Sequence, residues 1–341
     1  MFLTMDQIDH TINWLLANGS PTIQYLTHKH LLKTSSGSPE MLALWQHMET
    51  CPAALEILSK QEPDGSWYSG GSWALKPSYL PAGGWDPYNP KYVTSVWILP
   101  LLGEMGFTVL DPRIRKACEY VLTHGYFLNP IFEQLQTLDL RTADLSPCRF
   151  AQYLFALASV GLANERQVII GYDYLLQMQR SDGGWALPQH ILERNWTRSC
   201  PFSTYHAVMA LYHSGNPAYR GALVKGLEFL AWHLSTKEDV DFGKFFYHGH
   251  SLLRELLVFS EFGIGLDSIA IHTIIEWLSS MYSPQEGCFR YPGKPISQYS
   301  HHLDGMDHRV AKYRLYHLIE NDWLTYHLTR VGLNLNNFKG L

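Results

Sequence analysis

Four residues that can bind a metal recur at similar intervals along the chain. Cys148, Cys200, His250 and His308 follow one another after 52, 50 and 58 residues. Thiolate and imidazole are ligands that zinc prefers in tetrahedral sites, and a helix N-terminus favours the thiolate form of cysteine. If the four residues begin equivalent helices, the pattern predicts a zinc site. The alternative is that they are ordinary side chains, too far apart around the fold to share one ion.

Candidate acid and nucleophile side chains lie near the same positions. Asp144 and Asp307 are candidate general acids, because a buried carboxylic acid with a raised pKa can protonate an alkene. Cys200 is the candidate nucleophile, since a thiolate at a helix start is activated for attack. For the two aspartates, helix N-capping is the alternative explanation.

Aromatic side chains near the starts of these helices are candidates for substrate binding. Their ring faces stabilise cations, and together the rings would form an apolar wall. Packing in the core is the alternative, because aromatic residues at helical spacing fill cores as well. The candidate substrate-binding residues are Tyr92, Trp97, Phe150, Tyr153, Phe202, Tyr205, Phe246 and Tyr247.

A repeated pair of helices would position these residues. Each of four segments contains a helix that ends at a glycine, a polar linker, and a second helix with an acid, an aromatic and an aliphatic residue in a row. The acids are 54, 55 and 48 residues apart, so the repeat is a helical hairpin of about fifty residues. Apolar residues recur with helical spacing, and no run alternates like a longer strand. The glycines are Gly106, Gly161, Gly215 and Gly263, and the acids are Glu119, Asp173, Glu228 and Glu276.

The pattern predicts an all-α protein with one domain over residues 1–341. Four further helices are expected over residues 5–17, 21–33, 39–49 and 52–60. Stacked hairpins either spiral into a solenoid or close into a ring. In a ring, residues 1–60 complete the circle, and the starts of the more apolar helices meet at one end of a central cavity.

A short phrase, Gln-x-x-Asp-Gly-[Ser/Gly]-Trp, occurs twice, at Gln61–Trp67 and at Gln179–Trp185. A degenerate copy, SPQEGCFRY, has Gly287 in the glycine position, and we align Phe289 one step beyond the tryptophan position. We expect a structural role for the phrase. Asp-Gly would make a tight turn, the glutamine would hydrogen-bond to backbone at the start of the next helix, and the tryptophan would pack over the joint between hairpins.

The phrase resembles the QW repeat of the terpene cyclase and prenyltransferase superfamily, which includes squalene–hopene cyclases. The resemblance covers most of residues 55–290. It implies an α/α toroid, an α6/α6 barrel, in which an apolar isoprenoid substrate is cyclised or transferred in a central cavity. The chain would be a divergent member, because it lacks the Asp-x-Asp-Asp acid motif, the Asp-x-Cys zinc pair and the Asp-Asp-x-x-Asp magnesium motif. Two other functions stay open: a zinc-dependent enzyme that uses the Cys/His residues, and a non-catalytic binding protein on the same scaffold.

Composition and charge exclude several other classes of protein. The 341 residues are 46% hydrophobic and carry a net charge of −5, and no stripe of Lys and Arg marks a nucleic-acid partner. Five widely spaced cysteines predict reduced thiols in a cytosolic protein. The N-terminal segment lacks signal-peptide features, and no stretch approaches the ~18 apolar residues of a membrane span. We expect a cytoplasmic protein with an apolar small-molecule partner and zinc as its one candidate cofactor; peripheral membrane contact stays open.

Overall fold

The computed structural model describes residues 2–67, 94–124, 146–187, 191, 197–236, 252–290 and 321–339. Helices predominate in these ranges, where the regular strands are one short antiparallel pair, β1 (Tyr282–Ser283) and β2 (Cys288–Phe289). This confirms the all-α class. Contacts between Cα atoms divide the chain into two compact units, Met1–Ile57 with Leu234–Leu341, and Leu58–His233. The closed ring and the single domain stay predictions, and each unit is taken by itself below.

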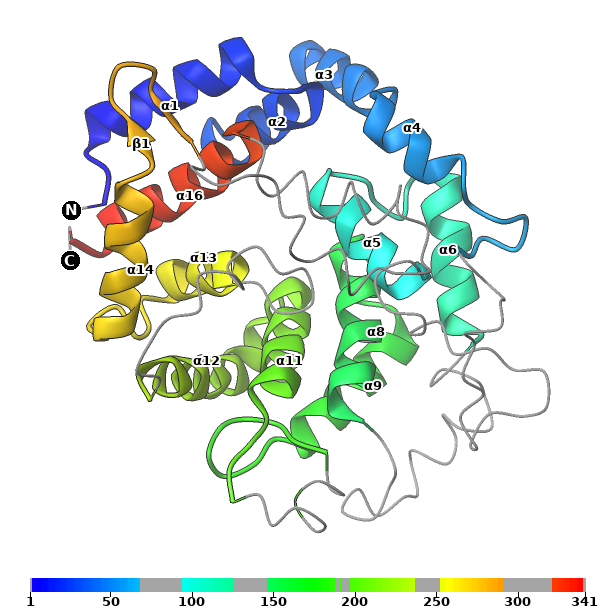
Figure 1. Cartoon of the computed structure of the whole chain (residues 1–341). Helices are drawn as coiled ribbons and strands as arrows, with labels where there is room; N and C mark the ends of the chain where they lie inside the picture. Colours follow the sequence, from blue (N-terminus) through cyan, green and yellow to red (C-terminus); the bar gives the residue numbers. More distant parts are fainter. Residues whose placement is uncertain are drawn as a thin grey trace, which may run out of the picture. The chain divides into compact units, whose positions relative to one another are not determined.

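The described residues of the unit 58–233 form three helical hairpins (Figure 1). As predicted, the chain turns at a glycine between the two helices of each pair; Gly215, for example, caps its helix in the left-handed conformation. Three of the six helices begin with a proline, whose missing N–H costs nothing at that position. The hairpins are α5 (Ser95–Glu104) with α6 (Pro112–Leu122), α8 (Pro147–Ser159) with α9 (Arg166–Gln177), and α11 (Pro201–Ser214) with α12 (Arg220–Ser235).

The first helix of each hairpin is a core helix and the second covers it. Residues 95–102, 150–158 and 203–211 of the core helices α5, α8 and α11 are buried without interruption. The helix α8 packs against both α5 and α11. Gln152 of α8 donates from Nε2 to the carbonyl of Val96 in α5 at 2.7 Å. The covering helices α6, α9 and α12 keep exposed residues on one side, and Tyr172 of α9 donates to the carbonyl of Ala210 in α11 at 2.8 Å.

The other unit is built around one long buried helix, α16 (Asn321–Lys339), which packs against α1, α13 and β2 (Figure 1). The fourth predicted hairpin is present as α13 with α14. The predicted N-terminal helices are also present, except that the second one ends as a π-helix, Thr27–Leu31. The remaining bounds are α1 Met5–Asn18, α2 Pro21–Leu26, α3 Pro39–Glu49, α4 Pro52–Leu58, α13 Leu252–Phe262 and α14 Ile269–Ser279. Within the described ranges, no helix has the length and apolarity needed to cross a membrane.

Candidate functional site

The repeated phrase forms a joint of the same construction each time; Gln61–Trp67 is called the first joint and Gln179–Trp185 the second. The Nε2 of Gln179 donates to the carbonyls of Gly183 and Ala222, both at 2.8 Å. The Nε2 of Gln61 donates to the carbonyls of Gly65 at 2.9 Å and of Arg113 at 2.8 Å. Because Arg113 and Ala222 lie in the first turns of α6 and α12, each glutamine ties its turn to the next covering helix.

The aspartate of each joint holds the turn closed. Asp182 accepts hydrogen bonds from the Gly184 N–H at 3.2 Å, the Ser199 N–H at 2.8 Å and the Ser199 hydroxyl at 2.6 Å. Asp64 accepts from the Ser66 N–H at 2.9 Å and from its hydroxyl at 2.6 Å. Burial alone would raise the pKa of Asp182, but these hydrogen bonds from Ser199 and Gly184, with the charge of Arg180, outweigh burial and lower it.

The lowered pKa of Asp182 makes stability at this joint depend on pH. A carboxyl whose folded-state pKa lies below its ordinary value of 3.8 stabilises the fold above that pH and loses this contribution as pH falls through the folded pKa. We expect Asp182→Asn to lower the free energy of unfolding by about 1 kcal/mol at neutral pH and by less near pH 3. Urea unfolding of the wild type and the variant at both pH values measures the difference in unfolding free energy. If this difference is not smaller near pH 3 than at neutral pH, the pH-dependent role of Asp182 is contradicted.

The last residue of each joint is fixed by a hydroxyl from a core helix. The N–H of Trp67 donates to Ser95 of α5 at 3.1 Å, and the N–H of Trp185 donates to Thr204 of α11 at 3.0 Å. The Trp185 indole also donates to the carbonyl of Leu175 at 2.8 Å. Both tryptophans are buried. The tryptophan thus pins the start of the core helix to the end of the preceding covering helix.

The degenerate copy forms a third joint, Ser283–Phe289, and corrects our alignment of it. The N–H of Phe289 donates to the Thr325 hydroxyl of α16 at 2.9 Å, as the tryptophans do at the other joints. Phe289 therefore takes the tryptophan position itself and not the next one, since it follows Gly287 by two residues, as Trp185 follows Gly183. Ring stacking of Phe289 on Phe2, with centroids 5.7 Å apart, fills the place of the larger indole.

The joints reveal a second repeat that our sequence analysis missed. Thr204, whose hydroxyl accepts the hydrogen bond of the second joint, is the first residue of the triplet Thr204-Tyr205-His206. Thr325, the acceptor at the third joint, begins the identical triplet Thr325-Tyr326-His327. An aromatic residue precedes each threonine by two positions, Phe202 in one case and Trp323 in the other. The repetition was visible in the sequence; it acquires meaning once both threonines are seen to bind a joint.

His206 lies among aromatic rings from two core helices. Its ring centroid is 5.8 Å from that of Trp97 on α5, 4.4 Å from Phe202 and 5.3 Å from Tyr205, and all three contacts are edge-to-face. The side chain is 1% exposed. Two core helices, α5 and α11, thus supply the imidazole and its aromatic neighbours, and α8 packs against both of them.

His327 contacts the aromatic residues of its own triplet region in the other unit, with its ring stacked on Trp323. Its ring centroid is 5.9 Å from Trp323 and 5.1 Å from Tyr326, and the side chain is buried. The two copies differ at the tyrosine, because the Tyr326 hydroxyl hydrogen-bonds to Nδ1 of His30 in the π-helix. Arg330 adds a cation over the Tyr326 ring, with Cζ 5.8 Å from the centroid.

The structure brings together three of the aromatic residues predicted to bind substrate: Trp97, Phe202 and Tyr205, which meet at His206. Phe150 instead packs against Tyr174 of the covering helix α9, with centroids 5.8 Å apart, and Tyr153 is fully buried in α8. The substrate-binding role of all five remains a prediction. The other predicted aromatics, Tyr92, Phe246 and Tyr247, lie outside the described residues.

The two predicted cysteine ligands begin adjacent core helices. The Sγ of Cys148 lies 3.0 Å from the Ser146 hydroxyl at the start of α8, and Cys200 is the N-cap residue of α11, with its N–H donating to the carbonyl of Trp185 at 2.8 Å. Both are half-buried. Within the described ranges, no three His, Cys, Asp or Glu side chains are grouped to hold a metal. The predicted partners His250 and His308 and the predicted acids Asp144 and Asp307 lie outside those ranges.

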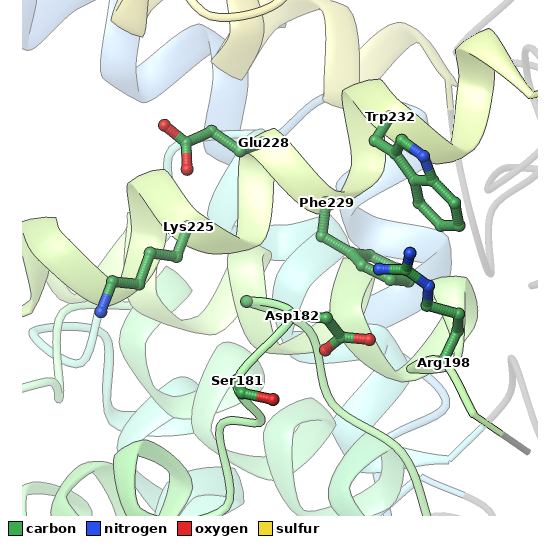
Figure 2. Close-up of a pocket in the computed structure, with 8 residues that line it drawn as sticks. Ser181, Asp182, Arg198, Lys225, Glu228, Phe229 and Trp232 are labelled. Atoms are coloured by element: carbon green, nitrogen blue, oxygen red, sulfur yellow. The ribbon is translucent and has the colours of Figure 1, made fainter.

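A pocket of about 330 Å³ lies beside the second joint (Figure 2). The guanidinium of Arg198 sits over the indole of Trp232, with Cζ 4.8 Å from the ring centroid. None of the residues predicted as metal ligands, acids, nucleophile or substrate-binding aromatics lines this pocket. The lining residues are Ser181, Asp182 and Gly183 of the joint, Arg198, and Lys225, Glu228, Phe229 and Trp232 of α12.

Comparison with models of protein families and with curated proteins found no match. Among solved structures, the chain is similar to the apo form of a variant type II terpene cyclase from Scytonema. The two are 11% identical, the match covers 98% of this chain and 100% of the other, and the TM-score is 0.31. A likeness at this level decides neither the closure of the ring nor the activity.

Proposed function

We propose that the protein is a terpene cyclase- or prenyltransferase-like enzyme that acts on an apolar, isoprenoid-type substrate. The α/α toroid of this proposal is supported by the three joints, at each of which the N–H of the last residue donates to a hydroxyl of the following helix. The observation that carries the function is the cluster of Trp97, Phe202 and Tyr205 around His206. It combines an apolar wall with a group that accepts and returns protons.

The chemistry of this cluster suits a carbocation reaction. Aromatic faces stabilise a cation without reacting with it as water would. A neutral imidazole completes the sequence: its nitrogen lone pair takes a proton from the carbon beside the cationic centre, the C–H electron pair becomes the new C=C bond, and the imidazole becomes imidazolium. Burial of the cluster keeps water from competing for the cation. His206 is the proposed base, and His327 is its counterpart in the second Thr-Tyr-His triplet.

Incubation with isoprenoid substrates tests the proposal directly. Purified protein is mixed with polyprenyl diphosphates of several lengths and with squalene, and products are sought by mass spectrometry. We expect at least one substrate to yield a cyclised or transferred product. Absence of product from every member of the panel overturns the enzymatic proposal. Saturable binding without turnover would instead favour the non-catalytic binding protein.

A zinc-dependent enzyme is the second candidate, favoured by the two half-buried cysteines at the starts of adjacent core helices. The sulfur ligands of Cys148 and Cys200 fit the softness of zinc. With His250 and His308, they would hold an ion that activates water or a thiolate. We expect elemental analysis to find about one zinc per chain, and Cys200→Ser to lose most of it. A metal-free wild-type protein, or a variant that keeps its zinc, contradicts this site.

A further inference from the structure

The pocket beside the second joint can be compared with the same place at the first joint, because the two joints have the same construction. A Cβ on Gly183 would lie 2.5 Å from the carbonyl oxygen of Lys225, and a Cβ on Gly65 would lie 2.6 Å from that of Lys116. Lys116 of α6 and Lys225 of α12 are therefore equivalent positions. Counting on from them pairs Glu119 with Glu228, Tyr120 with Phe229, and Thr123 with Trp232.

This pairing shows which residue types occur at both joints and which occur at one of them. A lysine, a glutamate and an aromatic residue occur at both joints, so the scaffold accounts for them. Seven residues after the lysine, however, the first joint has Thr123 and the second has Trp232, which is 40% exposed. Exposing a large indole to water is unfavourable. The guanidinium of Arg198 forms a cation–π contact with this indole. Among the described residues, Trp232 is thus the side chain that distinguishes the second joint from the first, and Arg198 lies over its ring.

The guanidinium of Arg198 can receive an anion. Its Cζ lies 4.8 Å from the centroid of the Trp232 indole, and every polar group of a guanidinium is a donor. Within the described part of the chain, Arg198 makes no hydrogen bond or ion pair. A guanidinium held by packing loses little further freedom when two of its parallel N–H groups bind an oxyanion.

The other charged groups of the pocket leave Arg198 available. The carboxylate of Asp182 already accepts three hydrogen bonds from Ser199 and Gly184. In Figure 2, the carboxylate of Glu228 points away from Arg198 and Trp232, and the Lys225 side chain extends away from them as well. Asp182 stays negatively charged at neutral pH, since its pKa is lowered, and Arg198 is the cation that lies against the exposed indole.

We infer that this pocket binds a small molecule that carries an oxyanion, a carboxylate or a phosphate, on a flat apolar body. The oxyanion pairs with the N–H groups of Arg198, and the apolar body covers the exposed part of Trp232. The volume of about 330 Å³ lies within the range of small-molecule pockets. The inference is independent of the proposed isoprenoid chemistry, because the lining belongs to the second joint, Arg198 and the covering helix α12.

Calorimetric titration of the full chain with four probes tests the inference: phenyl phosphate, benzoate, inorganic phosphate and the neutral benzamide. We expect saturable binding of phenyl phosphate or benzoate that weakens with added salt, and much weaker binding of inorganic phosphate and benzamide. The stronger of the first two probes tells which oxyanion the pocket prefers. Arg198→Gln should weaken binding about tenfold or more, which corresponds to loss of a charge-assisted pair.

The first joint supplies matched variants. Trp232→Thr removes the indole and installs the residue found at the equivalent position, Thr123, the C-cap of α6; it should weaken binding about fivefold, and thermal unfolding checks that the variant is folded. Lys116→Gln, at the first joint, should leave binding unchanged. The inference is overturned if no anionic probe saturates, if benzamide binds as tightly as benzoate, or if Arg198→Gln binds like the wild type.

Discussion

Replacing Gly183 with alanine is expected to lower the free energy of unfolding by about 3 kcal/mol or more. The glycine has φ +86°, a conformation that strains any residue with a Cβ. In addition, the new Cβ would lie 2.5 Å from the carbonyl oxygen and 3.0 Å from the carbonyl carbon of Lys225. Both are backbone atoms of α12, so the clash is relieved only by moving the covering helix. Chemical denaturation of the two proteins measures the loss.

Gly65→Ala should cost nearly as much, because its φ is +93° and its Cβ would lie 2.6 Å from the carbonyl oxygen of Lys116. Gly215 is the matched control: its φ is +62°, but no described atom lies within 4 Å of the point that a Cβ would occupy there. We expect Gly215→Ala to cost about 1 kcal/mol from backbone strain alone. Gly221→Ala, in an open helical position, should be neutral or stabilising by about 0.5 kcal/mol. Equal losses at Gly183 and Gly215 would show that close packing at the joint contributes nothing.

Elements set by local pattern were predictable from the sequence. The helical hairpins follow from apolar residues at helical spacing and from the glycines between the helices, and prolines mark several starts. The roles of glutamine and Asp-Gly in the joints also follow from local chemistry, as the bonds of Gln179 and Asp182 show. The third joint was harder, because it keeps the glycine but has Ser283 in place of glutamine and Glu286 in place of aspartate.

Contacts between distant segments were not predictable in the same way. His206 contacts Trp97, which lies 109 residues earlier on another core helix. Phe150 lies on the core helix α8, yet it packs against Tyr174 of a covering helix. A buried core helix is apolar on every side, so its sequence does not tell which side faces a covering helix. The Arg198–Trp232 pair likewise joins a loop to a helix whose register only the fold provides.

Replacing His206 with glutamine is expected to reduce the turnover number for the isoprenoid substrate by about 100-fold or more while changing KM little. Glutamine retains a polar side chain of similar reach but cannot take a proton from a carbocation. Steady-state kinetics, with products identified by mass spectrometry, provide the measurement.

His213→Gln is the matched control, because His213 lies on the same helix and also contacts aromatic rings, with its centroid 4.9 Å from that of Phe155 and 5.1 Å from that of Tyr212. His213 does not belong to a Thr-Tyr-His triplet that binds a joint, so we expect its variant to have near wild-type turnover. His327→Gln tests the second triplet; since Tyr326 is also held by His30, a smaller loss there would assign proton transfer to the His206 copy. Thermal unfolding of each variant separates a lost base from a lost fold. A folded His206→Gln protein with unchanged turnover would remove His206 from the mechanism.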